Sequence, residues 1–531
     1  MTQLLLGPLL RHVGETSATV WVETSRACEV TVAGRSARTF EVAGHHYALV
    51  VLTGLAPGTS TEYDVRLDGR TVWPEPGSDL PPSRIRTLAP DAPFRLVFGS
   101  CHQPRHDRAH GTDALAVYAG RLVKQPESHW PQSLLLAGDQ VYADETTTEI
   151  QRWLATRRDI RLPPGTEVAD FEEYCHLYYE SWSDPLLRWL MSTVPVSMLF
   201  DDHDVRDDWN ISRAWQEKMR RKSWWRERLR GGFISYWIYQ HIGNLGPDEL
   251  ARDPLFQRVT RSGVDNADTL REFADIADDE ADGHKSARWS YCRNFGRVRL
   301  LAVDTRAGRI LAGGRRSMVS EAEFEWIEGH ARGEQDHLLI ASTLPWLLPE
   351  AISHMESVNE RACRRRGLRG WLAEWLRQWL DLGHWAAFRS SFDRLARLVR
   401  SVAASEDAPT TIAVLSGDVH HAYVAEAAYP EQLRSRVHQV TCSPVHNSAS
   451  RLSRLAFTIG WWRPMAAVSR RWATWAGVPR LPVRWRRVSG PHFGNAIATI
   501  DVRGSEAVAF LEQARDGRLT ALPPVRLSGP D

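Results

Sequence analysis

The sequence predicts a protein of the α/β class, in which an N-terminal β-sandwich (residues 1–88) precedes a layered α/β domain (residues 89–531). Two observations support this. Up to residue 88 the chain consists of short alternating runs separated by Gly, Pro, Ser and Asp turns. From residue 89 the apolar runs are continuous, with helical segments between several of them. Alternating runs are typical of strands with one exposed face, and continuous runs of strands covered on both faces.

The first domain contains four runs that read as strands: 17-SATVWVET-24, 28-CEVTVAG-34, 46-HYALVVLTGL-55 and 61-TEYDVRLDG-69. The segment 52-LTGLAPGTSTEYDVRLDG-69 has the sequence pattern of a fibronectin-type or immunoglobulin-like sandwich: a strand, a Pro-Gly turn and a strand carrying a buried Tyr. The Pro-rich residues 74–93 predict a linker to the second domain.

In the second domain six apolar runs each end in a polar cluster: 94-FRLVFGSCHQ, 133-SLLLAGDQVYAD, 195-PVSMLFDDHD, 298-VRLLAVDTR, 337-HLLIASTLPW and 411-TIAVLSGDVHH. Helices are expected over 212–233 and 319–332, between such strands. Open α/β sheets place their sites at the carboxyl ends of the strands. We therefore expect the polar clusters to meet at one edge of the sheet.

The composition is that of a soluble protein of more than one domain, with 531 residues, 43% hydrophobic and 25% charged. A formal net charge of +1 gives no reason to expect nucleic acid as a partner. The start lacks a basic n-region, and no run reaches about 18 apolar residues, so we expect a cytoplasmic protein. Six cysteines without CxxC spacing argue against a disulfide framework or a structural zinc site.

Two of the clusters offer oxygen and imidazole ligands directly after a strand. In 137-AGDQVYAD-144, Asp139 is followed by Tyr142 and Asp144, which suits a hard cation or else a polar turn. In 416-SGDVHH-421, His420 lies two residues after Asp418, so both side chains can point the same way along an extended segment. The alternative for this second cluster is a pair of satisfied histidines at a strand end.

The most acidic cluster is 199-LFDDHDVRDDWN-210, with five aspartates, His203 and one arginine within eight residues. So many like charges cannot all ionise cheaply beside one another. An acidic turn is usually a solvated surface, but this one follows the apolar run PVSMLF and is harder to solvate. Metal binding is therefore favoured over a plain acidic turn.

Two further strand ends leave alternatives open. Cys101 is either a small core residue or a thiolate ligand. Asp304 and Arg306 are either a local ion pair or the lining of a phosphate site, where a guanidinium offers a planar fork. Taken together, four strand-end clusters of Asp, His and Cys in one domain indicate a two-metal hydrolase.

The motifs GSCHQ, GDQVYAD, DDHD, DTR and GDVH, in this order, resemble the alkaline phosphatase D (PhoD-like) family of metallophosphatases. The upstream sandwich and the phrases 344-LPWLLPEAISHMESVNE-360 and 381-DLGHWAAF-388 resemble the same family. The likeness to calcineurin-like and purple acid phosphatases is more distant. The resemblance implies a layered α/β metallophosphatase domain of that kind, with a fibronectin/Ig-like domain before it.

The resemblance also implies a set of metal ligands, with Asp139 bridging two ions: Cys101, Asp139, Tyr142, Asp418 and His420. Tyr142 as phenolate implies ferric iron at one site. The second site is expected to hold calcium or another divalent cation, such as Mn, Zn or Mg. His203 is implied as an acid/base or phosphate contact. The chain departs from the family where a pair of asparagines is usual, because Asp207 and Asp208 stand there; we count Asp207 among the expected metal ligands.

The expected reaction is phosphoester hydrolysis, in which a metal-bound hydroxide attacks phosphorus in line. Arg306 and His203 would neutralise charge on the phosphoryl oxygens, and His203 or His421 would protonate the leaving group. Asp202, Asp304 and Arg306 are the expected substrate contacts. The alternatives are a phosphodiesterase or phospholipase D-like hydrolase, or an inactive binding protein with a metallophosphatase fold.

The chain has 23 tryptophans, and three segments combine tryptophan with arginine: 223–230, 371–385 and 454–488. Trp371, Trp375, Trp379 and Leu382 follow one another at i, i+4, i+8 and i+11, which favours a buried helix face over a membrane anchor. The basic segment 454–488 is less regular and is the candidate for peripheral membrane contact or a lid. His446 and His492 either approach the site from late loops or cap strands.

Overall fold

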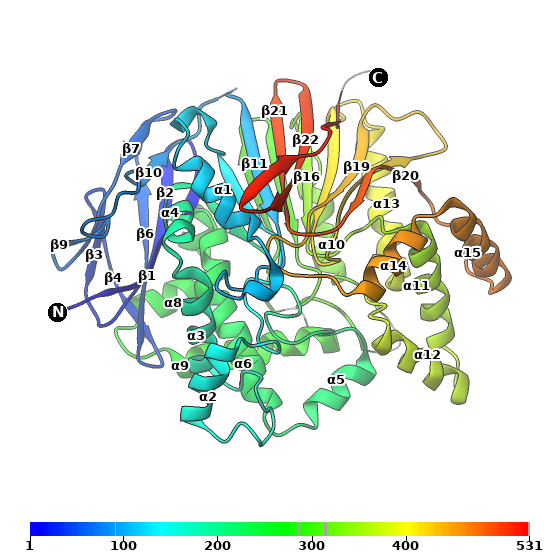
Figure 1. Ribbon diagram of the computed structural model, residues 1–531, viewed down its shortest axis with the longest axis horizontal. Helices are drawn as coiled ribbons and strands as arrows, with labels where there is room; N and C mark the ends of the chain where they lie inside the picture. The colour runs from blue at the N-terminus through cyan, green and yellow to red at the C-terminus, as the bar shows by residue number, and fades with distance from the viewer. Residues whose placement is uncertain (91, 285, 313–315, 529–531) are drawn as a thin grey trace.

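The computed structural model describes residues 1–90, 92–284, 286–312 and 316–528, and it confirms the predicted α/β class with a β-rich N-terminal region (Figure 1). In the view of Figure 1 the N-terminal strands lie at the left, two large sheets stand in the centre, and a group of helices lies at the right. Within the described residues no helix is long and apolar enough to cross a membrane.

The N-terminal strands form two four-stranded sheets and a two-stranded ribbon. One sheet has the order β1 (Leu4–Val13), β2 (Ser17–Thr24), β6 (His45–Thr53), β5 (Phe40–Val42). The other has the order β4 (Arg35–Arg38), β3 (Glu29–Val32), β8 (Val65–Leu67), β9 (Arg70–Trp73). The ribbon pairs β7 (Ser60–Glu62) with β10 (Arg84–Arg86). Buried residues of both sheets, such as Val20, Val50, Val30 and Val65, share one hydrophobic cluster. The predicted boundary between residues 88 and 89 stays a prediction.

The remainder of the chain is built on two seven-stranded mixed sheets. The first has the order β13 (Val196–Met198), β12 (Ser133–Leu136), β11 (Phe94–Gly99), β21 (Ala496–Arg503), β22 (Glu506–Arg515), β23 (Arg518–Ala521), and β24 (Val525–Arg526) also pairs with β22. The second has the order β14 (Tyr291–Phe295), β15 (Val298–Val303), β16 (His337–Ser342), β17 (Thr411–Ser416), β19 (Arg436–Thr441), β18 (Ala422–Ala428), β20 (Arg484–His492).

Alternate residues of these strands serve different cores, which is why their sequences are apolar without a break. Leu96 and Phe98 belong to the cluster between the two sheets, as does Leu300. Their neighbours Val97 and Leu301 belong to the clusters on the outer faces. The sheets are therefore two inner layers, with helices on both outer sides.

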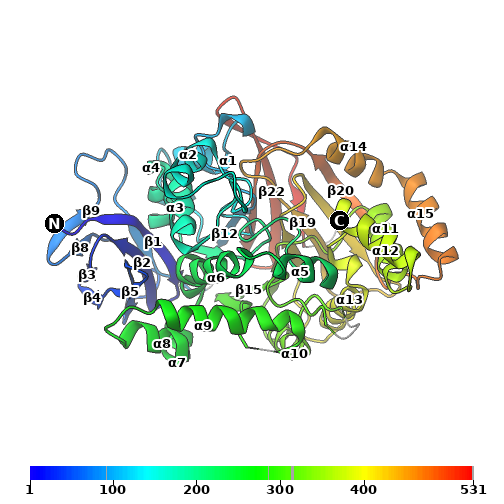
Figure 2. The same cartoon turned by 90° about the horizontal axis from the view of Figure 1, so that it is seen from below.

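Helices on the side of the first sheet are α1 (Ala114–Leu122), α2 (Thr148–Arg157), α3 (Phe171–Trp182), α4 (Pro185–Thr193), α5 (Arg213–Arg220), α6 (Trp225–Ser235), α7 (Pro247–Arg252), α8 (Pro254–Arg261) and α9 (Ala267–Asp278) (Figure 2). Those in the second half are α10 (Glu321–His330), α11 (Glu350–Cys363), α12 (Leu368–Trp379), α13 (Arg389–Ala403), α14 (Arg451–Gly460) and α15 (Arg463–Trp475). The single helix expected over 212–233 is thus two, α5 and α6, with a turn between them.

Strands β11, β12 and β13 are mutually parallel, and so are β15, β16, β17 and β19. The six strands predicted to end in polar clusters are therefore all present, and within each sheet their carboxyl ends lie at one edge. This is the edge at which open α/β sheets form sites.

A buried arginine ties the first strand to the large domain. Arg11 on β1 is fully buried and donates to the main-chain oxygens of Val196, Tyr239 and Gln240 at 3.1, 2.6 and 2.6 Å. It also donates to Asn244 Oδ1 at 3.2 Å. Four buried acceptors of the large domain thus depend on one side chain from the N-terminal sheet.

We expect Arg11→Met to destabilise the protein by at least about 3 kcal/mol, because it removes charged hydrogen bonds and leaves buried acceptors unsatisfied. The measurement is denaturant unfolding followed by tryptophan fluorescence. Arg66→Met on the same β-rich region is the control, since the Arg66 side chain is 51% exposed and pairs with the nearby Asp64; its effect should stay within about 0.5 kcal/mol. An Arg11→Met protein as stable as this control would contradict the account.

Helix α12 contradicts the prediction that its tryptophans form a buried face. Trp371, Trp375 and Trp379 are 64%, 50% and 64% exposed, and of the predicted stripe only Leu382 is buried. The helix instead buries small residues and one arginine: Gly370, Ala373 and Arg377.

Polar contacts with α11 explain this orientation. Arg377 Nη2 donates to Glu360 Oε2 at 2.7 Å, and Asn359 Nδ2 donates to the main-chain oxygen of Ala373 at 2.8 Å. Both contacts need the face of α12 that carries the small residues to lie against α11. The side of α12 that carries the three tryptophans consequently points away from α11.

Candidate functional site

The strand ends bring a cluster of buried acidic side chains together. Asp139 follows β12, and Asp201 and Asp202 follow β13. Each of the three offers a carboxylate oxygen, and these atoms lie within 4.8 Å of one another. All three residues are buried. The cluster lies beside the end of β11, where Cys101 Sγ is 3.2 Å from Asp139 Oδ2.

The backbone at these strand ends is held in an unusual conformation. Cys101, Asp139, Asp418 and His420 have φ values of 59°, 52°, 65° and 48°, in the left-handed region that non-glycine residues rarely adopt. Such conformations cost free energy and are concentrated at functional sites. Here the four residues lie directly after three strands, β11, β12 and β17.

Two glycines of the predicted GD motifs allow the strands to approach so closely. A Cβ on Gly138, whose φ is 105°, would lie 2.7 Å from the side chain of Asp201. A Cβ on Gly417 would lie 2.0 Å from Ser100 Oγ. These positions therefore exclude any larger residue without displacement of the acidic cluster.

Several buried carboxylate oxygens of the cluster have no hydrogen-bond partner among the described residues: Asp139 Oδ1, Asp201 Oδ2 and Asp202 Oδ1. Burial, together with Cys101 and Asp201, raises the pKa of Asp139 well above its usual value. Burial likewise raises the pKa of Asp201, despite the nearby Arg306. Buried, mutually repelling and unpartnered oxygens are the donor set that a hard cation completes.

Cys101 and Tyr142 add a thiol and a phenol to this cluster. Burial, followed by the charge of Asp418, raises the pKa of Cys101 to about 12. Burial and the charges of Cys101 and Asp139 raise the pKa of Tyr142 well above its usual value. The Tyr142 hydroxyl accepts a hydrogen bond from Asn447 Nδ2 at 2.8 Å. Both groups need a neighbouring cation to ionise at neutral pH.

Arg306 lies among three of the carboxylates. Its Nε donates to Asp201 Oδ1 at 2.6 Å, and its Nη2 is 3.1 Å from both Asp202 Oδ2 and Asp418 Oδ1. The guanidinium is fully buried and does not line the pocket described below. It thus neutralises part of the acidic charge from behind the cluster.

Asp418 and His420 hold different protonation states. Burial alone would raise the pKa of Asp418, but the hydrogen bond from His384 and the charge of Arg306 lower it below its usual value. Burial lowers the pKa of His420 to about 4, so its imidazole is neutral at pH 7. An ionised carboxylate and a neutral imidazole are the forms that bind metals.

His203 is oriented by an aspartate that sequence reasoning did not assign a role. His203 Nδ1 lies 2.9 Å from Asp144 Oδ1, and the His203 ring is 4.7 Å from that of Tyr142. Burial would lower the pKa of His203, but Asp144, Asp139 and Asp202 together raise it well above its usual value. The residue lines the pocket, so it presents a protonated imidazole to whatever binds there.

The two aspartates that stand where asparagines were expected differ from each other. Asp207 is exposed, lines the pocket, and has Oδ1 3.8 Å from His203 Nε2. Burial and the carboxylate of Asp381 raise the pKa of Asp208 to about 10. At neutral pH Asp208 therefore carries a proton and resembles a carboxamide in charge and shape.

Four of the residues that the sequence singled out do not line the pocket: Asp304, His421, His446 and His492. Asp304 caps a turn by accepting from the main-chain N–H groups of Arg306, Ala307 and Gly308. His421 donates to the main-chain oxygen of Val419 at 2.7 Å and packs against Phe457. Of the two histidines from late loops, His446 donates to the main-chain oxygen of Gln103, and His492 lies 2.9 Å from Ser489 Oγ.

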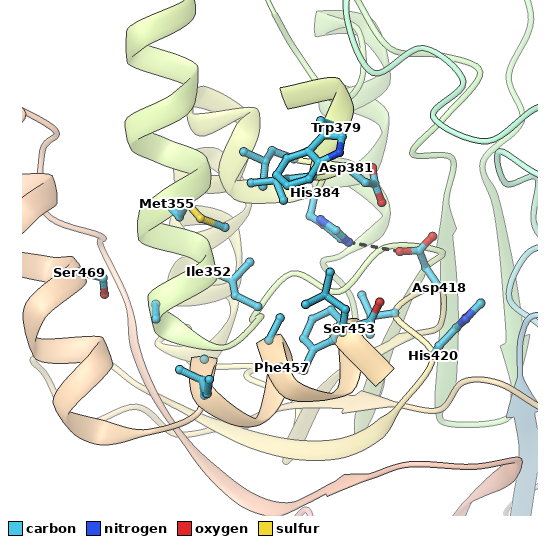
Figure 3. Close-up of a pocket in the computed structure, with 18 of the residues that line it drawn as sticks. Ile352, Met355, Trp379, Asp381, His384, Asp418, His420, Ser453, Phe457 and Ser469 are labelled. Carbon is cyan, nitrogen blue, oxygen red and sulfur yellow. Dashed lines mark hydrogen bonds and ion pairs between the residues drawn. The ribbon is translucent and has the colours of Figure 1, made fainter. Parts of the chain in front are cut away.

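Sequence reasoning missed His384 as a member of the site. His384 Nε2 lies 3.2 Å from Asp418 Oδ2, and its Nδ1 lies 2.8 Å from Glu356 Oε1 (Figure 3). Asp381 also lines the pocket. The signal was present, because these residues belong to the two phrases 344–360 and 381–388 that resemble the PhoD-like family. Their roles were unassigned because neither phrase ends a strand.

The acidic cluster opens into a pocket of about 720 Å³. One end is polar, with Asp139, Asp202, His203, Asp418 and His420. The rest is lined by apolar side chains from α11, α12, α14 and α15, including Ile352, Met355, Trp379, Phe457 and Trp472, and by Leu382 from the loop after α12. Figure 3 shows Asp418 and His420 at one end and Ile352, Met355 and Phe457 toward the other.

A layered α/β fold with an acidic, histidine-bearing cluster at the strand ends is consistent with the hydrolase that the sequence predicted. Comparison with known proteins adds a family match. Residues 112–249 match the family described as PhoD-like phosphatase, and residues 1–85 match a family described as Domain of unknown function (DUF7800). Residues 112–249 thus match the family that the motifs predicted, and this match supports a phosphatase enzyme.

The fold is similar to that of a solved structure titled "Structure of PhoD", with a TM-score of 0.57 and 12% sequence identity. The match covers 98% of this chain and 92% of that chain. At this identity the likeness concerns the fold, and it supports the predicted architecture over nearly the whole chain. No curated protein matches the sequence.

Proposed function

We propose that the protein hydrolyses phosphoesters with a metal centre built on the acidic cluster. The observation that carries this proposal is the group of unpartnered, buried oxygens on Asp139, Asp201 and Asp202, beside a thiol and at the mouth of a pocket. Without a cation, so many desolvated acceptors would be costly to bury. The PhoD-like family implies metal-dependent catalysis, and this donor set fits it.

The residues that would hold the metals are those the family resemblance implies: Cys101, Asp139, Tyr142, Asp418 and His420, with Asp139 shared between two ions. Thiolate and phenolate suit ferric iron, and the carboxylate side with Asp202 and Asp207 suits calcium or another hard divalent cation. When bound, the metals would supply an acidified water and positive charge opposite the phosphoryl oxygens.

The other residues act by position and charge. Arg306 contacts Asp201, Asp202 and Asp418 and so holds the three carboxylates in one arrangement. His203, held at Nδ1 by Asp144, keeps Nε2–H free toward the pocket and donates that proton to a phosphoryl oxygen or to the leaving alkoxide. Because His421 does not line the pocket, we assign the acid role to His203 alone.

The test is hydrolysis of p-nitrophenyl phosphate and bis(p-nitrophenyl) phosphate by protein loaded with iron and calcium, and separately with Mn, Zn or Mg. We expect chelation to abolish hydrolysis and readdition of the correct ions to restore it. The ratio of the two rates decides between a monoesterase and a diesterase. Full activity in protein shown by elemental analysis to be free of metal would overturn the proposal.

A further inference from the structure

The helices around the pocket carry an unusual share of the protein's exposed apolar surface. All six exposed tryptophans of the described residues lie on α12, on α15 or directly before α15: Trp371, Trp375, Trp379, Trp462, Trp472 and Trp475. Soluble proteins rarely leave a contiguous apolar patch of this kind uncovered, and such patches mark interaction sites. We call the exposed surface of α12, α14 and α15 the tryptophan face.

The tryptophan face is continuous with the apolar part of the pocket. Trp379 and Trp472 are exposed and also line the pocket. Leu452 and Ile459 of α14 do the same, at 72% and 39% exposure. Helices α12 and α15 both pack on α11, and α14 contacts α11 and α15 (Figures 1 and 2). A molecule that covers the face therefore meets the opening of the pocket.

Most of the exposed charges on and beside the tryptophan face are arginines. Residues 451–487 contain nine arginines, all exposed, and no aspartate or glutamate. Four more exposed arginines, at positions 364, 365, 366 and 369, precede or begin α12. The whole chain, by contrast, has a formal net charge of only +1. Exposed tryptophan and leucine surrounded by arginine is the composition of elements that lie in the interface of an anionic membrane.

We propose that the tryptophan face docks on an anionic lipid bilayer, so that the apolar part of the pocket receives the hydrocarbon chain of a lipid phosphoester. The hydrocarbon chain of the lipid would lie among Ile352, Met355 and Phe457. Its phosphoester group would then lie at Asp139 and Asp418. The contact is peripheral, because no described helix can cross a membrane. The choice of substrate rests on the proposed phosphoesterase function, whereas the docking does not.

Docking is tested by flotation with vesicles of phosphatidylcholine, with and without phosphatidylglycerol. We expect the protein to float with the anionic vesicles, to float less with phosphatidylcholine alone, and to lose binding as salt is raised. The Trp462→Ser/Trp475→Ser protein should bind at least about 10-fold more weakly. Neither residue lines the pocket, and both are exposed, so the unfolding midpoint should not change.

Val264→Ser is the matched control, because Val264 is 65% exposed but precedes α9, away from the tryptophan face. It should float like the wild type. Flotation of the Asp139→Asn protein separates docking from catalysis, since a failed phosphatase would still bind vesicles. Absence of vesicle binding, or equal binding by the double variant, overturns the proposal. A wild-type dimer that the double variant converts to a monomer, without any vesicle binding, would show instead that a second copy covers the face.

Binding of a hydrocarbon chain in the pocket is tested with two soluble diesters that share a leaving group, methyl and octyl p-nitrophenyl phosphate. We expect kcat/KM to be at least about 10-fold higher for the octyl ester, because its additional methylene groups enter the apolar pocket. Ala456→Trp, on the pocket wall of α14, should bring the octyl-to-methyl ratio toward one. Equal kcat/KM for both esters in the wild type would overturn chain binding, and no hydrolysis of either would overturn the proposed function.

Discussion

Asp139→Asn is expected to lose bound metal and to hydrolyse phosphoesters at least about 100-fold more slowly than the wild type. The substitution keeps the shape of the side chain but removes one of the three converging carboxylates and its charge. It also replaces one of the two carboxylate oxygens, of which Oδ2 lies 3.2 Å from Cys101 Sγ, with an amide nitrogen. Asparagine tolerates the left-handed φ of 52° at this position, so the backbone should be kept.

The measurements are kcat/KM with a soluble phosphoester and elemental analysis of the purified variant. Asp268→Asn on α9 is the control, because the Asp268 side chain is 99% exposed. It should match the wild type in both metal and rate. Asp139→Asn protein with full metal and full activity would show that the ions, or the reaction, lie elsewhere.

His203→Gln is expected to lower kcat about 100-fold, the usual contribution of a positioned general acid. Metal content should not change, because His203 is not among the proposed ligands. The effect should be smallest with p-nitrophenyl esters, whose leaving group needs little protonation, and largest with alkyl esters. A rate loss that is equal for both kinds of ester would argue for a phosphate contact in place of acid catalysis.

The pH dependence of kcat is an independent test of the acid role of His203. Asp144 and its neighbours raise the pKa of His203, so the protonated, active form persists above the usual histidine range and is lost as pH rises through the raised value. Asp144→Asn removes the strongest raising partner. The alkaline limb of kcat should therefore move to lower pH, while activity at acidic pH is kept. An alkaline limb that does not move would exclude His203 as the group that titrates there.

The strand ends of the site could be predicted because local sequence determines them. An apolar run followed by a polar cluster specifies both the strand and the place where it ends, and parallel strands bring such ends together. Asp139, Asp202 and His420 belong to strand-end clusters that were singled out in this way, and all three line one pocket. The glycines before Asp139 and Asp418 are part of the same local signal.

The contribution of His384 could not be read from a strand end. It reaches Asp418 from the loop after α12, and Glu356 holds it from α11. Periodicity within a helix shows that two residues share a face, but it does not show which other helix lies against that face. Only the packing of α11 against α12 determines this position.

The tryptophans of α12 also show that periodicity does not reveal what a helix face packs against. Their spacing correctly predicts that they share a face, but burial of that face was the wrong inference. The helix is held by Arg377 and Glu360 and by the close approach that Gly370 and Ala373 permit. Hydrophobicity alone could not anticipate that polar and small residues would form the inner side.

The central claim, a metal centre on the strand-end cluster, is tested most directly by the metal stoichiometry of the purified chain. Protein equilibrated with iron and calcium and then dialysed should retain about two ions per chain, as a two-metal site requires. The Asp139→Asn/Asp418→Asn protein, equilibrated in the same way, should retain fewer than one. Equal metal in both proteins, or none in an active wild type, would contradict the account.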